Sequence, residues 1–346
     1  MPAPVDLRSD LHARPTEEMW AAMRDAELGW ATYGEDASVN ALQERVAALL
    51  GHEAGLWVPT CGMANLVAMM TLARPGRAVV LESQSHVLTS EGMGISDVAG
   101  LDPHSLWAAD GRLDPADVSD LMGETGARLL VLENTHTRAG GTTLSPERTA
   151  ELAEVALRHG AYVHLDGARL PNAAVALGVA PEELARPADT VAFSLNKAVG
   201  APFGTILAGG GLAIDRARAN LRRIGGASVH KAGLAAAAAL VGLEGLEGRI
   251  AEDHRRAREL GALLAELPGL RLDPETIETN IVLVDAGGTG FAPDELLRLL
   301  AAEGVLGMER DTSRIRFVTH RGIGDAEVAR AAEAMARVLA EQAPEV

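Results

Sequence analysis

The chain has 346 residues, of which 47% are hydrophobic, so it is long enough to bury a large core as one big domain plus a smaller one. Its formal net charge of −17 would repel a phosphate backbone and its basic residues are dispersed, which excludes nucleic acid and anionic membrane surfaces as expected partners. The opening residues contain no apolar signal region and the longest apolar stretch, LAAAAALVGL, is about half of a ~20-residue membrane span, so we expect a soluble cytoplasmic protein.

Short β-rich runs alternate with longer helical patterns along the first two thirds of the chain, which is typical of crossover units and a mainly parallel sheet. The first unit predicts a strand, a turn of small residues at Cys61 and Gly62, and a helix that starts near Met63. A later helix is expected to begin at Ser145 as its N-cap and to close at Gly160. Five further runs are too short and too continuously apolar for surface helices: GRAVVLE, ARLLVLE, AYVHLD, TVAFSL and TILAGG.

The last third of the chain has a different pattern. From about residue 234 a long helical stretch leads to the turn-like LPGLRL, and a compact strand-helix-strand-helix unit follows. We therefore expect an N-terminal segment (1–35), a large α/β domain (36–240) and a small C-terminal α+β domain (241–346).

A lysine follows one of the predicted strands, and lysine is rare in this sequence. The chain contains only Lys197 and Lys231 beside 29 arginines. Lys197 comes after TVAFSL and before the loop-like AVGAPFG, which places its amine at the end of a strand, where α/β sheets bind ligands. A lone lysine there is usually a solvated surface charge. A lysine that persists where arginine is otherwise used is better explained by imine formation, which arginine cannot perform.

A carboxylate occupies the same kind of position one predicted strand earlier. Asp166 ends AYVHLD, Gly167 lets the chain turn, and Arg169 lies just beyond. Asp166 alone could be a turn cap. Together with Lys197 it suggests pyridoxal phosphate, which needs a lysine for its aldehyde and a carboxylate for its pyridine nitrogen. The free N–H groups at the start of the helix near Met63 would suit its phosphate.

An ordered series of motifs resembles one family. The series runs through most of the chain: DLRSD, YGEDASVNALQERVAALLG, VPTCGMAN, LENTHTRAGG, HLDGARLPNAAVALGV, SLNKAVGAPFG, AEDHRRAREL, ETNIV and RFVTH. It is similar to the low-specificity L-threonine aldolases of the β-eliminating lyase group, pyridoxal-phosphate enzymes of the aspartate-aminotransferase-like fold (fold type I). The resemblance implies retro-aldol cleavage of an L-β-hydroxy-α-amino acid to glycine and an aldehyde.

The resemblance also implies roles for individual residues. Lys197 would be the Schiff-base lysine, Asp166 the partner of the pyridine nitrogen and His86 the ring stacked on the cofactor, with His136 near the substrate hydroxyl. Cys61, Gly62 and Met63 would face the phosphate. Homodimers or homotetramers with sites at subunit interfaces are implied as well. Four residues would complete the substrate site, three of them holding the carboxylate and the last coming from a neighbouring subunit: Ser9, Arg169, Arg316 and Tyr33.

Several positions depart from the family pattern. Leu11 stands in SDL where SDT is usual, Cys61 where a Gly-Thr pair offers a hydroxyl, and Asn196 in SLNK where LSK is usual. The segment GGASVHKAG stands where GGGMRQAG is usual. In that segment and just before it, Arg223, His230 and Lys231 are expected to share the contacts to the cofactor phosphate. These changes leave threonine, allo-threonine, phenylserine and bulkier analogues open as substrates.

Other functions use some of the same residues. β-Elimination, dehydration, racemisation or transamination would need Lys197 and Asp166 but would begin by removing the α-proton. Cys61, the only cysteine, could be a hydrolase nucleophile at a helix N-terminus, where a thiolate is favoured. A descendant that binds the cofactor without catalysis is a further alternative. One cysteine excludes an internal disulfide and a multi-cysteine metal site, and no metal is expected.

Overall fold

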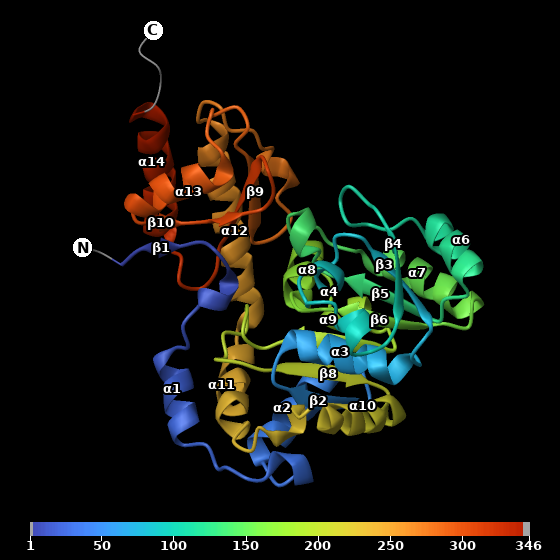
Figure 1. Cartoon of the computed structure of the whole chain (residues 1–346). Helices are drawn as coiled ribbons and strands as arrows, with labels where there is room; N and C mark the ends of the chain where they lie inside the picture. The colour runs from blue at the N-terminus through green and yellow to red at the C-terminus, as the bar shows by residue number, and fades with distance from the viewer. Residues whose placement is uncertain (1–2, 342–346) are drawn as a thin grey trace. The chain divides into compact units, whose positions relative to one another are not determined.

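The computed structural model describes residues 3–341, and its contacts divide the chain into two compact units (Figure 1). Arg14–Leu246 form the larger unit. The segment up to Ala13 forms the smaller unit together with the residues from Glu247 onward. The expected N-terminal segment 1–35 is therefore divided between the two units at Ala13.

The larger unit contains a seven-stranded sheet in the order β2-β8-β7-β6-β5-β3-β4. The pairs among β4, β3, β5, β6 and β7 are all parallel, whereas β8 runs antiparallel to both of its neighbours. This is the predicted α/β sheet, and each of the five apolar runs forms a strand of it. The bounds are β2 Ala54–Val58, β3 Ala78–Glu82, β4 Asp102–Leu106, β5 Leu129–Glu133, β6 Tyr162–Asp166, β7 Thr190–Ser194 and β8 Thr205–Gly209.

The central strands are buried on both faces because helices cover the sheet. Every residue of β3, β5, β7 and β8 is buried. Ser145 caps α7 as expected, since its side chain accepts a hydrogen bond from Arg148 N. The α-helices of this unit are α1 Glu17–Arg24, α2 Ala37–Leu49, α3 Cys61–Leu72, α4 His86–Thr89, α5 Gly94–Asp97, α6 Pro115–Thr125, α7 Pro146–Arg158, α8 Leu170–Leu177, α9 Pro181–Ala185, α10 Gly211–Arg223 and α11 Gly233–Leu243.

Three acidic residues end three neighbouring parallel strands. Glu82 is the last residue of β3, Glu133 of β5 and Asp166 of β6, and Glu133 is the register partner of Asp166. All three are less than a tenth exposed. The carboxyl ends of parallel strands meet at one edge of a sheet, so the topology itself gathers these charges.

The long helical stretch predicted from residue 234 is two helices. α11 ends at Leu243 and α12 spans Leu246–Ala265. Gly245 between them adopts a φ of 60°, a left-handed conformation that interrupts the helix and that glycine adopts without steric cost. The apolar periodicity continues across this break, which is why the pattern alone predicted one helix.

The smaller unit is built as the strand-helix-strand-helix pattern predicts. β9, β12 and β11 form an antiparallel sheet, and β1 pairs in parallel with β10. Apolar residues of α12, α13 and α14 pack with the strands in one core. The bounds are β1 Val5–Asp6, β9 Ile281–Asp285, α13 Pro293–Ala302, β10 Val305–Leu306, β11 Met308–Glu309, β12 Arg314–Val318 and α14 Asp325–Glu341. Within residues 3–341, no helix is long and apolar enough to cross a membrane.

One strand of the large sheet carries a histidine with no exposed surface. His164 on β6 lies within hydrogen-bond distance of Thr190 Oγ1 on β7 and of Asn65 Oδ1 on α3, both at 2.9 Å. Burial lowers its pKa from 6.5 to about 4. His164 is therefore neutral in the folded protein at neutral pH.

This burial predicts a specific loss of stability in acid. The unfolded chain takes up a proton near pH 6.5, whereas folded His164 resists protonation until about pH 4, so the free energy of unfolding should fall over that interval by up to about 3 kcal/mol for this group. Urea unfolding at a series of pH values should show a smaller fall for His164→Asn than for wild type. His104→Asn, on the partly exposed edge strand β4, is the matched control. Equal slopes for His164→Asn and wild type would contradict the assignment.

Candidate active site

The Asp166 carboxylate is at the centre of the site and is held by donors from three directions. Asn65 Nδ2 donates to Oδ2 at 2.9 Å, Ala168 N donates to Oδ1 at 3.1 Å, and Cys61 Sγ lies 3.8 Å from Oδ1. His164 and Asp166 are two residues apart on β6, so their side chains lie on the same face of the strand. Asn65 on α3 contacts both of them. Asn65 therefore connects the buried His164 to the Asp166 carboxylate.

Lys197 lies on the loop after β7, the strand next to β6. It is half-buried, and its charge acts on the Cys61 thiol across the site. The structure thus brings the predicted lysine, aspartate and cysteine together at one edge of the sheet. Ser194 Oγ donates to Asn196 Oδ1 at 2.7 Å, so the unusual Asn196 closes the turn that carries Lys197.

Helix α3 starts two residues earlier than predicted. Cys61 and Gly62 belong to its first turn, because the Thr60 side chain caps the helix by accepting from Met63 N at 3.2 Å. The backbone N–H groups of Cys61 and Gly62 donate to no residue in the described part of the chain. These two N–H groups lie at the positive end of the helix, beside the one that Thr60 caps, and they could hold a phosphate.

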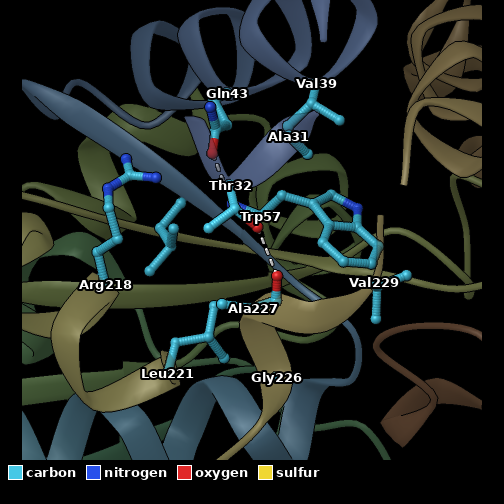
Figure 2. A pocket seen from close by; sticks show the side chains of 11 residues that line it. Ala31, Thr32, Val39, Gln43, Trp57, Arg218, Leu221, Gly226, Ala227 and Val229 are labelled. Atoms are coloured by element: carbon cyan, nitrogen blue, oxygen red, sulfur yellow. Dashed lines mark hydrogen bonds between the residues drawn. The ribbon is translucent and has the colours of Figure 1, made fainter. Parts of the chain in front are cut away.

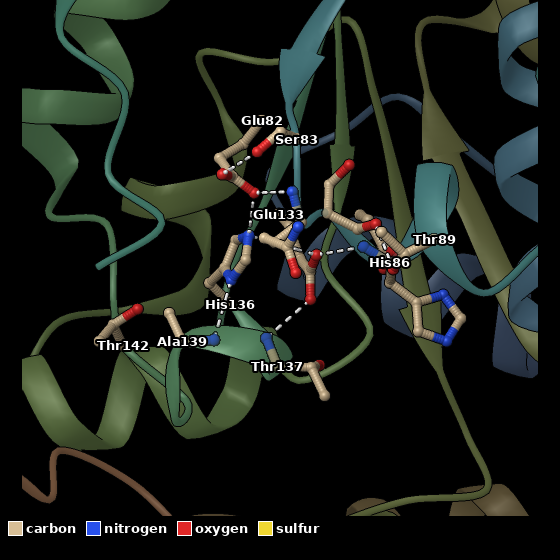
Figure 3. A network of polar contacts seen from close by, with 12 residues as sticks. Glu82, Ser83, His86, Thr89, Glu133, His136, Thr137, Ala139 and Thr142 are labelled. Atoms are coloured by element: carbon tan, nitrogen blue, oxygen red, sulfur yellow. Dashed lines mark hydrogen bonds and ion pairs between the residues drawn. The ribbon is translucent and has the colours of Figure 1, made fainter. Parts of the chain in front are cut away.

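His136 uses both of its ring nitrogens in contacts with the protein. Ala139 N donates to Nδ1 at 3.2 Å, so Nδ1 is an acceptor and the ring proton lies on Nε2. Nε2 lies 3.0 Å from Glu82 Oε2, and the ring is 3% exposed. Figure 3 shows this buried pair, with Glu133 beside it. His136 helps to lower the pKa of Glu82 against the opposing effect of burial.

His86 is held through its backbone, and its ring is less enclosed. Glu133 Oε2 accepts from His86 N at 2.7 Å, and in Figure 3 the ring points away from this contact. His86 Nδ1 lies 3.0 Å from Glu91 Oε1, and the side chain is 38% exposed. The hydrogen bond to Glu91, with the nearby charges of Asp166 and Glu133, raises the pKa of His86 against desolvation. His86 Nε2 bonds to no other residue within 3–341.

Arg169 is buried at the start of α8, close to the strand-end carboxylates. Arg169 is 4% exposed, and its guanidinium donates to Thr137 Oγ1 at 3.0 Å. Thr137 N in turn donates to Glu133 Oε1 at 2.8 Å. The guanidinium is thereby tied to the loop that carries His136.

The segment that departs from the family pattern packs against the start of α3. A Cβ on Gly226 would lie 2.4 Å from Met63 Sδ, so the absence of a side chain here leaves room for Met63 to pack against the segment. Thr32 Oγ1 donates to Ala227 O at 2.6 Å beside a small cavity (Figure 2). Arg223, expected near the phosphate, is exposed and donates to Asn220 Oδ1 at 2.9 Å.

Tyr33 and His230 belong to one aromatic cluster on the surface. The Trp30 ring lies 4.8 Å from Tyr33 and 5.7 Å from His230, edge to face in both pairs. Tyr33 is 68% exposed, and Lys231 is exposed beside the cluster in sequence. The cluster links the predicted inter-subunit tyrosine to the altered segment.

Ser9 and Arg316 belong to the smaller unit and lie near each other there. Arg316 donates to the backbone oxygen of Arg8 at 3.0 Å, and Ser9 is the N-cap of the 3-10 turn Asp10–His12. Leu11 is exposed within that turn, and its N–H donates to Ser9 Oγ. The two predicted carboxylate-binding residues thus come together from opposite ends of the chain.

Four polar residues of the site were missed by the sequence analysis: Asn65, Glu82, Glu91 and Glu133. Two of them had a usable signal, since Glu82 and Glu133 end apolar strands as Asp166 does. Glu91 lies between α4 and α5, and Asn65 is one residue of an apolar helix. The sequence around Asn65 and Glu91 contains no motif that indicates a function, because most of the residues that they contact lie far away in the chain.

Comparison with known proteins gives the same assignment from two directions. The β-eliminating lyase family model matches residues 6–287. Low-specificity L-threonine aldolase 1 of Arabidopsis thaliana is 36% identical over 94% of this chain and 93% of the plant protein. Two solved structures share the fold. Threonine aldolase from Leishmania major matches with a TM-score of 0.83 and 21% identity, over 98% of this chain and 100% of that chain. An aspartate aminotransferase from Rhodobacter sphaeroides matches with a TM-score of 0.75 and 18% identity, over 99% of this chain and 95% of that chain. The fold is therefore the predicted fold type I, and the chain belongs to the low-specificity L-threonine aldolases of the β-eliminating lyase family.

Proposed function

We propose that this lyase is a pyridoxal-phosphate-dependent aldolase that cleaves an L-β-hydroxy-α-amino acid, threonine or an analogue, to glycine and an aldehyde. The observation that carries the proposal is the buried Asp166 carboxylate, fixed by Asn65 at the end of β6, next to the strand that leads to Lys197. Relatives of the same family are named threonine aldolases, and a neighbour in fold is named a putative L-allo-threonine aldolase from Listeria monocytogenes. These names support the substrate class.

The donor set fits the cofactor. Asp166 would pair with the pyridine nitrogen, Lys197 would hold the aldehyde carbon, and the free N–H groups of Cys61 and Gly62 would donate hydrogen bonds to the phosphate. When bound, pyridoxal phosphate supplies an electron sink for the bond that breaks. Arg223 is exposed at the end of α10, so its contribution to the phosphate would need its side chain to leave Asn220.

The contacts of the two histidine rings show which of them is better placed to act as the base that deprotonates the substrate hydroxyl. Nδ1 is the lone-pair nitrogen of His136, and it would have to release the Ala139 N–H before it could accept a proton. His86 keeps Nε2 open, so it is the better candidate. We assign His136 a structural role, in which its Nε2 holds the Glu82 carboxylate in place.

Ser9, Arg169 and Arg316 would grip the substrate carboxylate. Arginine forks bind carboxylates bidentately and stay charged. Fixing the carboxylate fixes which bond to Cα stands perpendicular to the cofactor, and this choice separates Cα–Cβ cleavage from α-proton removal. The same choice separates the aldolase from a β-eliminating lyase, dehydratase or racemase with the same machinery.

We further propose a homodimer or homotetramer in the cytoplasm, with Tyr33 reaching a neighbouring subunit's site. The exposed Trp30–Tyr33 pair supports this, because large exposed aromatics in contact are common at interfaces. The small-molecule substrate and the acidic net charge give no reason to expect nucleic acid or membrane partners.

The lysine assignment can be tested by chemical labelling. Borohydride reduction should fix the cofactor covalently to the lysine that carries it, and peptide mapping should find the label on Lys197. Lys231 is the only other lysine in the sequence, so it is the natural control. A label on Lys231 would overturn the site assignment.

The reaction can be tested by identifying products. Incubation with threonine, allo-threonine, serine and phenylserine should yield glycine together with an aldehyde, measured by chromatography and a coupled aldehyde assay. His86→Asn should lower kcat roughly 100-fold, because a positioned base contributes about 10²–10⁴-fold. Keto acid and ammonia without glycine would instead establish an eliminating lyase.

The hydrolase alternative predicts a reactive thiol, and the structure predicts an inert one. Burial and the nearby Asp166 carboxylate raise the pKa of Cys61 well above the ordinary thiol value. Because only the thiolate is nucleophilic, iodoacetamide should modify native Cys61 much more slowly at neutral pH than it modifies the urea-unfolded chain. Mass spectrometry of the alkylated protein measures both rates. Comparable rates would restore Cys61 as a candidate nucleophile.

A further inference from the structure

Glu91 is a largely buried carboxylate that contacts both His86 and Asn65. It lies in the connection between α4 and α5, and its side chain is 10% exposed. Glu91 Oε1 is 3.0 Å from His86 Nδ1 and accepts from Asn65 Nδ2 at 2.9 Å. A Cβ on Gly62 would lie 3.3 Å from Glu91 Cδ, so the glycine leaves room for this carboxylate beside α3.

The Asn65 amide can point in only one direction. Its nitrogen donates to both Asp166 and Glu91, and its oxygen lies 2.9 Å from His164 Nε2. Because His164 is neutral and the amide oxygen can only accept, Nε2 carries the ring proton and Nδ1 accepts from Thr190 Oγ1. A flipped amide would turn its oxygen toward two carboxylates, so this chain of contacts fixes the position of Glu91.

A fixed Glu91 determines the state of the His86 ring. A carboxylate can only accept, so His86 Nδ1 must be the donor and carries a proton whether the ring is neutral or charged. In the neutral ring this leaves Nε2 as the lone-pair nitrogen. His136 shows the opposite arrangement, since Glu82 holds its Nε2 and the ring is enclosed.

We propose that Glu91 is a positioning residue that holds His86 through Nδ1, so that Nε2 is the nitrogen presented to the cofactor and substrate. The reaction in which Nε2 serves rests on the proposed function, whereas the control of the ring by Glu91 does not. Asn65 locks Glu91 in place and links it to Asp166. His86 and Asp166 are thereby connected through Glu91 and the Asn65 amide.

The test is the titration of His86 in the cofactor-loaded protein with and without the Glu91 charge. Protein labelled with ¹³C at histidine Cε1 gives one signal for each of the 10 histidines, and His86→Asn identifies the His86 signal. Glu91→Gln keeps the size of the side chain and removes its charge. Glu154→Gln, on the exposed face of α7, is the matched control.

In Glu91→Gln the His86 signal should titrate at lower pH than in wild type, because the largest stabilising contact of the charged ring is lost. Asp166 and Glu133 also face this ring from β6 and β5, and they remain in both proteins. Glu91→Asp, which keeps the charge on a shorter side chain, should recover part of the shift. Glu154→Gln should titrate as wild type does.

Turnover supplies the second readout. Glu91→Gln should lower kcat by about 10- to 100-fold, the range found at metal sites for loss of a carboxylate that orients a histidine, with little change in KM. An unchanged His86 titration in Glu91→Gln would overturn the inference even if threonine is cleaved. If wild type forms no glycine, the proposed function fails, and the titration still decides the role of Glu91.

Discussion

The burial of negative charge at one edge of the large sheet is the constraint on which the site depends. Three carboxylates end β3, β5 and β6, and a buried carboxylate is costly unless it receives hydrogen bonds. Each receives donors from different elements. Gln84 N and Ala108 N donate to Glu82, and Asn65 and Ala168 N donate to Asp166.

Satisfying these acids organises the loops that carry the chemistry. Glu133 accepts from His86 N with one oxygen and from Thr137 N with the other, so one carboxylate joins the loops after β3 and β5. Arg169 after β6 donates to Thr137. These hydrogen bonds therefore hold the loops in place, as apolar packing holds the strands of the sheet. They give His86, His136 and Arg169 defined positions.

The sequence predicted what depends on local pattern and on unusual composition. Buried strands read as continuous apolar runs, and Lys197 was conspicuous because only two lysines occur in the chain. Helix bounds at Cys61 and Gly245 were less predictable, since one depends on a threonine cap and the other on a single backbone conformation. Asn65 and Glu91 could not be predicted, because a polar residue gains its role here from partners brought together by folding.

Cys61 shows how the network accommodates a departure from the family pattern. A hydroxyl at this position would offer a strong donor, whereas a thiol is a weak one, and its contact with Asp166 is long at 3.8 Å. Burial and the charge of Asp166 keep the thiol protonated, so it adds no negative charge beside the carboxylate. Helix α3 still offers the N–H groups of its first turn, since Thr60 occupies only the third. A phosphate at this end would therefore be held by the backbone, an arrangement that tolerates the change of side chain because it does not depend on a hydroxyl.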